Sequence, residues 1–171
     1  MKKFNLAVCL FLLTACASGT KSNQNIDVKE AVDAAYATVL EENKVATMEM
    51  DKATVISYFG LDESLIEDAY GIGPMMSTHV DMIVAIKATK GNGEMVEDVV
   101  ETFQDNLERD SMTYPMNLAA ISEAEVFSEG NYVYYVRLNT YTSDDLSDEK
   151  KAEVIEQIND KAENAIEALY K

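Results

Sequence analysis

The sequence predicts an α+β domain in which N-terminal helices precede a β-α-β-β-α unit, with a small three-stranded mixed sheet packed on helices. Apolar residues alternate with period two over residues 80–87, as in a strand with a buried face, and residues 132–138 form an apolar, aromatic run that also predicts a strand. They recur at helical spacing over 95–107 and 147–170, as in amphipathic helices. With 47% hydrophobic residues, the chain has enough apolar surface for one core, so we predict a single domain over residues 26–171.

The helices before the first strand are predicted from their capping residues. Asp27 opens a capping box, and apolar residues at helical spacing predict a helix from there to about residue 43. Asp51 is placed to cap a short helix that Gly60 ends, and residues 62–70 read as a further helical turn or two.

The order of the three predicted strands follows from the connections between them. Residues 120–127 alternate weakly and carry acids on one face, which is typical of an edge strand. A tight turn then leads into residues 132–138, the most apolar and aromatic strand. If that strand lies between the other two, the unit is a split β-α-β with helices on one face. The alternation does not decide whether the second face is covered.

A loop over residues 70–78 is the candidate interaction site. Gly71, Gly73 and Pro74 predict irregular backbone there, and apolar side chains on such a loop would form a patch on an acidic surface. The candidate interaction residues are Tyr70, Ile72, Pro74, Met75 and Met76. The alternative is that these side chains fold inward as core.

The first eighteen residues have the parts of a bacterial lipoprotein signal. Lys2 and Lys3 precede an apolar run that is too short to span a bilayer. The run ends in Leu-Thr-Ala-Cys, which resembles a lipobox with cleavage between Ala15 and Cys16. We therefore expect a signal peptide over residues 1–15. The alternative is a conventional secretory signal that happens to contain Cys16.

The lipobox also predicts how the protein is attached. A diacylglyceryl group on Cys16 would supply the two acyl chains that stable anchoring needs. Residues 17–25 are small and polar, so residues 16–25 are expected to form a lipidated flexible tether. The expected location is the outer face of the cytoplasmic membrane. With Cys9 removed and Cys16 blocked, the domain has no thiol for catalysis, zinc or a disulfide.

The acidic composition limits the partners. The formal charge is −17, and loss of two lysines with the signal would take it to about −19. Nucleic acid is excluded as a partner because its binding depends on Lys and Arg at phosphates. Anionic headgroups would repel the domain too, so the membrane is expected to be reached through the acyl chains alone.

No familiar catalytic motif occurs in the sequence. It contains no Gly-x-Ser-x-Gly elbow, no His-Glu-x-x-His, no phosphate-binding glycine loop and no dinucleotide fingerprint. We therefore expect no enzymatic activity and no cofactor. The predicted function is a non-catalytic binding or interaction domain with an envelope protein partner; the alternative is a receptor for a small ligand or metal, in uptake or sensing.

Methionines and tyrosines offer two further hypotheses. Met75, Met76 and His79 lie within five residues, and residues 48–50 add two thioethers beside a short strand fragment; soft sulfur with imidazole suits Cu(I). The simpler interpretation, which we favour, is that these methionines fill core gaps and that there is no metal site. Three tyrosines of residues 132–138 are likewise expected to be core rather than a binding face.

Several segments together resemble a known family. They are the lipobox, the polar tether, the YGIGPMM loop, the strand DMIVAIKA, the TYP that follows a long helix, and the hairpin EGNYVYYV. In this combination the chain resembles an uncharacterised family of lipoproteins from Gram-positive bacteria that carry a domain of unknown function. The resemblance implies a location and a fold, and it brings no catalytic residues.

Overall fold

The computed structural model describes residues 25–110, 112–139 and 146–171, and it confirms the mixed α+β class. Its helices and strands, in chain order, are α1 (Val28–Tyr36), β1 (Thr47–Met50), α2 (Lys52–Phe59), β2 (Ile66–Pro74), β3 (Met82–Ala88), α3 (Gly93–Glu108), α4 (Leu118–Ser122), β4 (Glu125–Glu129), β5 (Tyr132–Arg137) and α5 (Asp148–Glu167).

The sheet has five strands in the order β1-β2-β3-β5-β4, and every adjacent pair is antiparallel. The predicted three-stranded mixed sheet is therefore wrong. The main error lies in residues 62–74, which form one 3₁₀ turn and then β2 rather than helical turns and a loop. A Cβ on Gly71 would lie 2.8 Å from Cγ2 of Val84 on β3, so this glycine permits close strand approach and does not make a turn.

The part of the sheet formed by β3, β5 and β4 matches the prediction more closely. β5 lies between the other two and β4 lies at the edge, as the aromatic and acidic patterns predicted. β3 and β4 run parallel to each other on either side of β5. Residues 118–122, however, form helix α4, so the edge strand begins only at Glu125.

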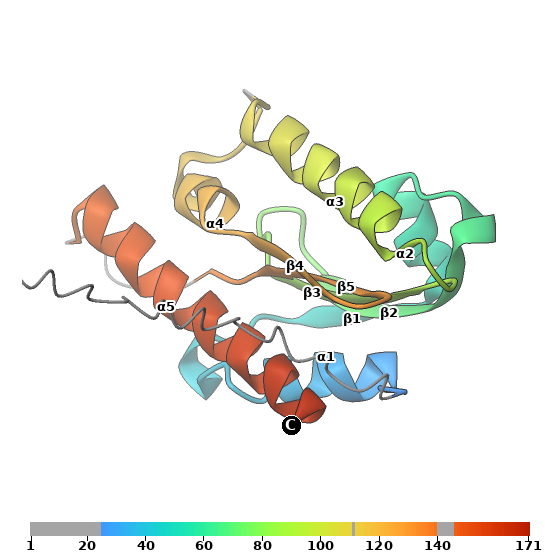
Figure 1. Ribbon diagram of the computed structural model, residues 1–171. Coiled ribbons are helices and arrows are strands. Elements are labelled where there is room, and N and C mark those ends of the chain that lie inside the picture. The colour runs from blue at the N-terminus through green and yellow to red at the C-terminus, as the bar shows by residue number, and fades with distance from the viewer. Residues whose placement is uncertain (1–24, 111, 140–145) are drawn as a thin grey trace, which may run out of the picture.

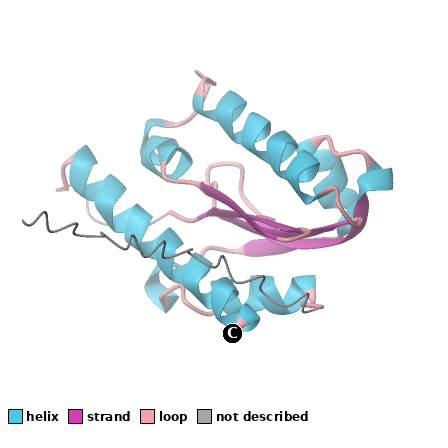
Figure 2. Ribbon diagram, in the orientation of Figure 1, coloured by secondary structure: helices cyan, strands magenta, loops and turns pink. Residues whose placement is uncertain are grey.

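Helices cover both faces of the sheet (Figures 1 and 2). α1 and α5 pack on one face and α2, α3 and α4 lie over the other, with a separate apolar cluster under each layer. Tyr132 and Tyr134 belong to the cluster beneath α1 and α5, and Tyr135 to the cluster beneath α2 and α3. All three are buried, which confirms that these tyrosines are core and do not form a binding face.

The predicted helix caps are present. Asp27 accepts hydrogen bonds from the backbone N–H groups of Lys29 and Glu30, Asp51 accepts one from Thr54, and Ser147 accepts one from Lys150. Gly60 ends α2 with a left-handed φ of 70°. The first helix ends at Tyr36 rather than near residue 43. Just beyond it, the Thr38 hydroxyl bonds the Ala35 carbonyl at 2.7 Å, and such local bonds compete with the helical ladder.

The predicted signal, the lipobox and all but the last residue of the tether lie outside the described residues. Asn25, the first described residue, lies at one end of the sheet, where its side-chain oxygen accepts from Lys87 at 2.8 Å and from Tyr132 at 3.3 Å. Met82 and Arg137 pair at the opposite end of β3 and β5. Within the described part of the chain, no helix is both long and apolar enough to cross a membrane.

Candidate functional site

The predicted interaction loop is divided between a buried strand and an exposed turn. Ile72 is 9% exposed and packs in the core beneath α1, so its predicted exposure is wrong. Tyr70 is partly buried under the Lys29 ammonium, which lies 4.6 Å from the ring centre. Met75 and Met76, beyond the end of β2, are 66% and 50% exposed. Strand alternation along β2 explains why Ile72 faces the core.

A cavity of about 430 Å³ opens next to this turn, at the end of the sheet where Met82 and Arg137 pair. We refer to it as the Arg137 cavity. It lies between β1, α2, the C-terminal end of α3 and residues 112–117, on the face of the sheet that α2 and α3 cover. Its lining is largely apolar, with side chains that include Met48, Met50, Met82, Met112, Tyr58, Leu107 and Ile121.

Arg137 brings a buried positive charge to this apolar cavity. Its side chain follows Tyr135 on the same face of β5, and the residue is only 3% exposed. The guanidinium donates to the Val80 carbonyl at 2.7 Å, the Tyr135 hydroxyl at 2.7 Å and, more weakly, the Tyr58 hydroxyl at 3.4 Å. All three acceptors are neutral. Within the described residues, no ion pair between Arg137 and a carboxylate is found.

A chain of hydrogen bonds holds the guanidinium in place. The Tyr135 hydroxyl donates to the Gln104 amide oxygen at 2.7 Å, and the Gln104 amide nitrogen donates to the Ile121 carbonyl and to Glu108. Burial raises the pKa of Tyr135 above its ordinary value, although the nearby Arg137 charge acts in the opposite direction. Tyr135 therefore stays neutral at physiological pH, and the one carboxylate in this network, Glu108, is joined to the guanidinium only through Gln104 and Tyr135.

The residues considered for a metal site separate in the structure. His79, Met48 and Met50 line the Arg137 cavity, whereas Met75 and Met76 are not among its lining residues. A cation placed in this cavity would be repelled by the guanidinium. The thioethers here are therefore better suited to apolar contact than to copper.

Arg137 is not among the site residues predicted from the sequence, although the sequence around it carries a signal. The strand reads YVYYVRL, and alternation places Arg137 on the same face as Val133 and Tyr135. A single cation on the buried face of a central strand is unusual, because charged groups are rarely buried without a partner. That pattern marks Arg137 for attention, but only the tertiary structure shows that it lines a cavity.

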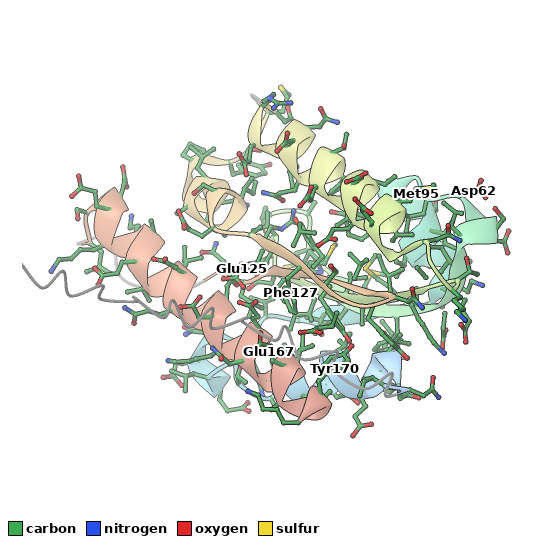
Figure 3. All side chains as sticks on the ribbon, in the orientation of Figure 1. Asp62, Met95, Glu125, Phe127, Glu167 and Tyr170 are labelled. Atoms are coloured by element: carbon green, nitrogen blue, oxygen red, sulfur yellow. The ribbon has the colours of Figure 1, made fainter. Side chains whose placement is uncertain are left out.

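A second group of titratable side chains lies between β4 and α5. Carboxylate oxygens of Glu125, Asp160 and Glu163 lie within 4.8 Å of one another, and Figure 3 shows Glu125 on β4 above α5. Oε2 of Glu125 is buried and has no hydrogen-bond partner. Burial, together with the charges of Glu163 and Asp160, raises the pKa of Glu125 from 4.5 to about 8. At neutral pH this carboxyl group therefore holds a proton, which relieves the repulsion.

We expect Glu125→Gln to stabilise the protein at pH 9. The folded-state pKa lies above the unfolded-state value, so the protonated carboxyl contributes stability that is complete below pH 4.5 and is lost as the pH rises through about 8. Because Glu125 is only partly buried, solvent screening reduces the gain to about 1–2 kcal/mol. Urea unfolding at pH 5.5 and pH 9 measures it.

The matched control is Glu153→Gln, an exposed change on α5. It lowers the net negative charge equally, so it isolates the general effect of charge. If Glu125→Gln and Glu153→Gln show the same difference between the two pH values, the raised pKa of Glu125 is refuted.

Comparison with known proteins identifies a family without a known activity. No curated protein and no solved structure matches the chain. Residues 39–138 match the family model described as Domain of unknown function (DUF4358). The matched region contains all five strands and every residue that lines the Arg137 cavity, and it leaves out α1 and α5. The match covers more than half of the sequence, so the chain belongs to the DUF4358 family.

Proposed function

We propose that this chain is a lipid-anchored extracytoplasmic protein whose domain binds a small molecule in the Arg137 cavity. The observation that carries the proposal is the cavity itself, a concave, largely apolar site of about 430 Å³ with a buried guanidinium in its wall. Binding sites for small molecules usually have volumes of about 300–1,000 Å³, apolar linings and a few oriented polar groups.

Binding, rather than catalysis, is the better supported activity. The sequence contains none of the catalytic motifs named above, and the matched family brings no catalytic residues. The buried charged group in the cavity wall is an arginine, which stays protonated at physiological pH and is suited to holding an anion rather than to exchanging a proton.

The location of the protein is proposed from the lipobox. Attachment through Cys16 would place the domain outside the cytoplasmic membrane, joined to it through Asn25. Because Asn25 and the Arg137 cavity lie at opposite ends of β3 and β5, the cavity lies away from the point of attachment. This arrangement is consistent with a site that takes its ligand from the surrounding medium.

We expect Cys16→Ala to abolish incorporation of labelled palmitate and to prevent stable membrane attachment, because the thioether to diacylglycerol cannot form. Labelling of cells followed by membrane fractionation measures both effects. Cys9→Ala is the matched control, since Cys9 lies within the predicted signal, and it should leave labelling intact. A Cys16→Ala protein that is cleaved, unlabelled and still firmly attached to the membrane would contradict the anchor.

A larger side chain at the opening of the cavity should weaken ligand binding. Met48 lines the cavity and is 52% exposed, so Met48→Trp would place a large ring at the opening without disturbing a buried side chain. The probes are four octyl-chain amphiphiles: octanoate, octanol, octyl phosphate and octyltrimethylammonium. We expect Met48→Trp to lower at least tenfold the affinity for those that bind, measured by titration calorimetry on the full chain in nanodiscs, with empty nanodiscs as the blank.

Met95→Trp is the control for the cavity-filling variant. Met95 is 53% exposed on α3 and does not line the cavity, so the same replacement there should leave affinity unchanged. If no octyl-chain amphiphile binds the wild-type chain, or if both variants bind as the wild type does, the proposed binding function fails.

An envelope protein partner is the second candidate function. The exposed thioethers of Met75 and Met76 favour it, because a cluster of apolar side chains on an acidic surface often marks a contact site. Crosslinking from this turn in intact cells tests it, and recovery of one specific membrane protein would support it.

A further inference from the structure

We propose that the ligand of the Arg137 cavity is a small amphiphile with a single carboxylate, which binds the guanidinium while its apolar body lies among the methionines. This inference rests on the proposed binding function and adds the chemical class of the ligand. It follows from the charge of Arg137, the composition of the walls and the net charge of the protein.

The buried charge of Arg137 has no direct ion-pair partner among the described residues. A guanidinium has five N–H donors, and oxygens of the described residues accept from it in three hydrogen bonds. A buried charge is costly without an opposite charge nearby, and the three acceptors are neutral. The planar fork of arginine matches the two oxygens of a carboxylate and can bind them through two parallel hydrogen bonds. An anion in the cavity would therefore supply the direct ion pair that no described residue makes with Arg137.

The walls of the Arg137 cavity are largely apolar. Met48, Met50 and Met82 contribute flexible thioethers, which adapt to ligands of irregular shape. Gly73 allows two of them to pack closely, since a Cβ there would lie 3.0 Å from Sδ of Met50 and 3.4 Å from Cε of Met82. Leu107 extends the same apolar wall. These walls favour an alkyl or other apolar body over a sugar or a nucleotide.

The whole protein is strongly acidic, which limits the charge that its ligand can carry. With a formal charge of −17, the domain repels anions at long range, and the repulsion grows with the charge of the anion. A single buried guanidinium can balance one negative charge. The combination therefore favours a monocarboxylate over a dianionic phosphate ester or a polyphosphate.

A head-group series on one alkyl chain tests this assignment. Octanoate, octanol, octyl phosphate and octyltrimethylammonium would be titrated into the full chain in nanodiscs, against empty nanodiscs. We expect octanoate to bind at least tenfold more tightly than octanol or octyl phosphate, and octyltrimethylammonium to bind most weakly. Arg137→Met should remove the preference for octanoate, and Arg137→Lys should reduce it because the fork is lost.

The series separates failure of the ligand class from failure of the binding function. If all four compounds bind with equal affinity and Met48→Trp weakens each of them, the assignment of a carboxylate ligand is overturned. The cavity would still be a binding site. Tighter binding of octyl phosphate would also overturn it. Absence of binding by every compound would overturn the proposed function itself. If Arg137→Met does not fold, the head-group preference of the wild-type chain decides the question alone.

A carboxylate could come from solution or from a lipid in the membrane, and a final comparison distinguishes the two. The position of the cavity, at the end of the sheet away from Asn25, favours a ligand in solution. Free octanoate should then bind the reconstituted chain, whereas a long-chain fatty acid confined to separate vesicles should not be extracted. If the protein extracts the fatty acid from the vesicles, the proposal that the ligand comes from solution is overturned.

Discussion

Gly93→Ala is expected to destabilise the domain by about 2–3 kcal/mol, although alanine is the better helix former. Gly93 is the first residue of α3 and lies beneath the hairpin that joins β4 to β5. A Cβ at this position would lie 2.4 Å from the Gly130 carbonyl oxygen and 3.3 Å from Cα of Asn131. Both neighbours are backbone atoms, so the hairpin and the helix would have to move apart.

Steric overlap therefore decides the sign of this change. In an open helix, replacement of glycine by alanine would stabilise the protein by about 1 kcal/mol. The hairpin cannot yield easily, because Gly130 adopts a φ of 67° and the Asn131 side chain is bonded to the Gly91 N–H at 3.0 Å. Thermal unfolding should show a melting temperature roughly 5–10 °C lower.

The control for this prediction is the neighbouring Glu94→Ala. Glu94 is exposed in the first turn of α3, so its replacement should change the free energy of unfolding by less than about 1 kcal/mol. A Gly93→Ala protein as stable as the wild type would show that the contact with the hairpin is not present.

Asn159→Leu is expected to cost about 2–4 kcal/mol, because it removes the hydrogen bonds of one buried and one partly buried backbone group. Asn159 is fully buried on α5. Its side-chain oxygen accepts from the Leu138 N–H at 3.0 Å, at the end of β5, and its side-chain nitrogen donates to the Glu123 carbonyl, just before β4. The side-chain amide of Asn159 thus joins α5 to the end of β5 and to the backbone just before β4.

Urea unfolding of Asn159→Leu, with Gln157→Leu as control, measures this effect. Gln157 is exposed on the same helix, so the control carries the same new side chain without loss of a buried partner. Equal stability of the two variants would contradict the role given to Asn159. Leucine keeps the branched, four-heavy-atom shape of the asparagine side chain but is bulkier, so the loss reports the missing hydrogen bonds together with some overpacking.

Local signals in the sequence were sufficient for the starts of three helices and for the β4–β5 hairpin. Asp27, Asp51 and Ser147 cap the helices that they were predicted to begin, because a side-chain cap and its helix are close in sequence. The interior position of β5, between β3 and β4, followed from its aromatic residues, which need cover on both faces. The proposed anchor at Cys16 also rests on a local pattern, and it stays a prediction.

The extent of the sheet was decided by contacts that are distant in sequence. Gly71 and Gly73 belong to β2 because neighbouring strand and methionine side chains occupy the space beside them. Nothing within residues 62–74 shows that those neighbours exist, so glycine and proline there were interpreted as a loop. The same limitation explains Ile72, which was expected on a surface patch and lies in the core.

The candidate site also combines features that the sequence predicts with features that depend on contacts distant in sequence. By itself, the sequence determined an acidic α+β chain with a lipoprotein-like start, capped helices, an aromatic central strand and methionines near its middle. Only the tertiary structure decided that Met48, Met82 and Arg137, from three separate strands, line one cavity. The physical reason is that periodicity reports which side of an element is buried, whereas a cavity depends on where packed elements fail to meet.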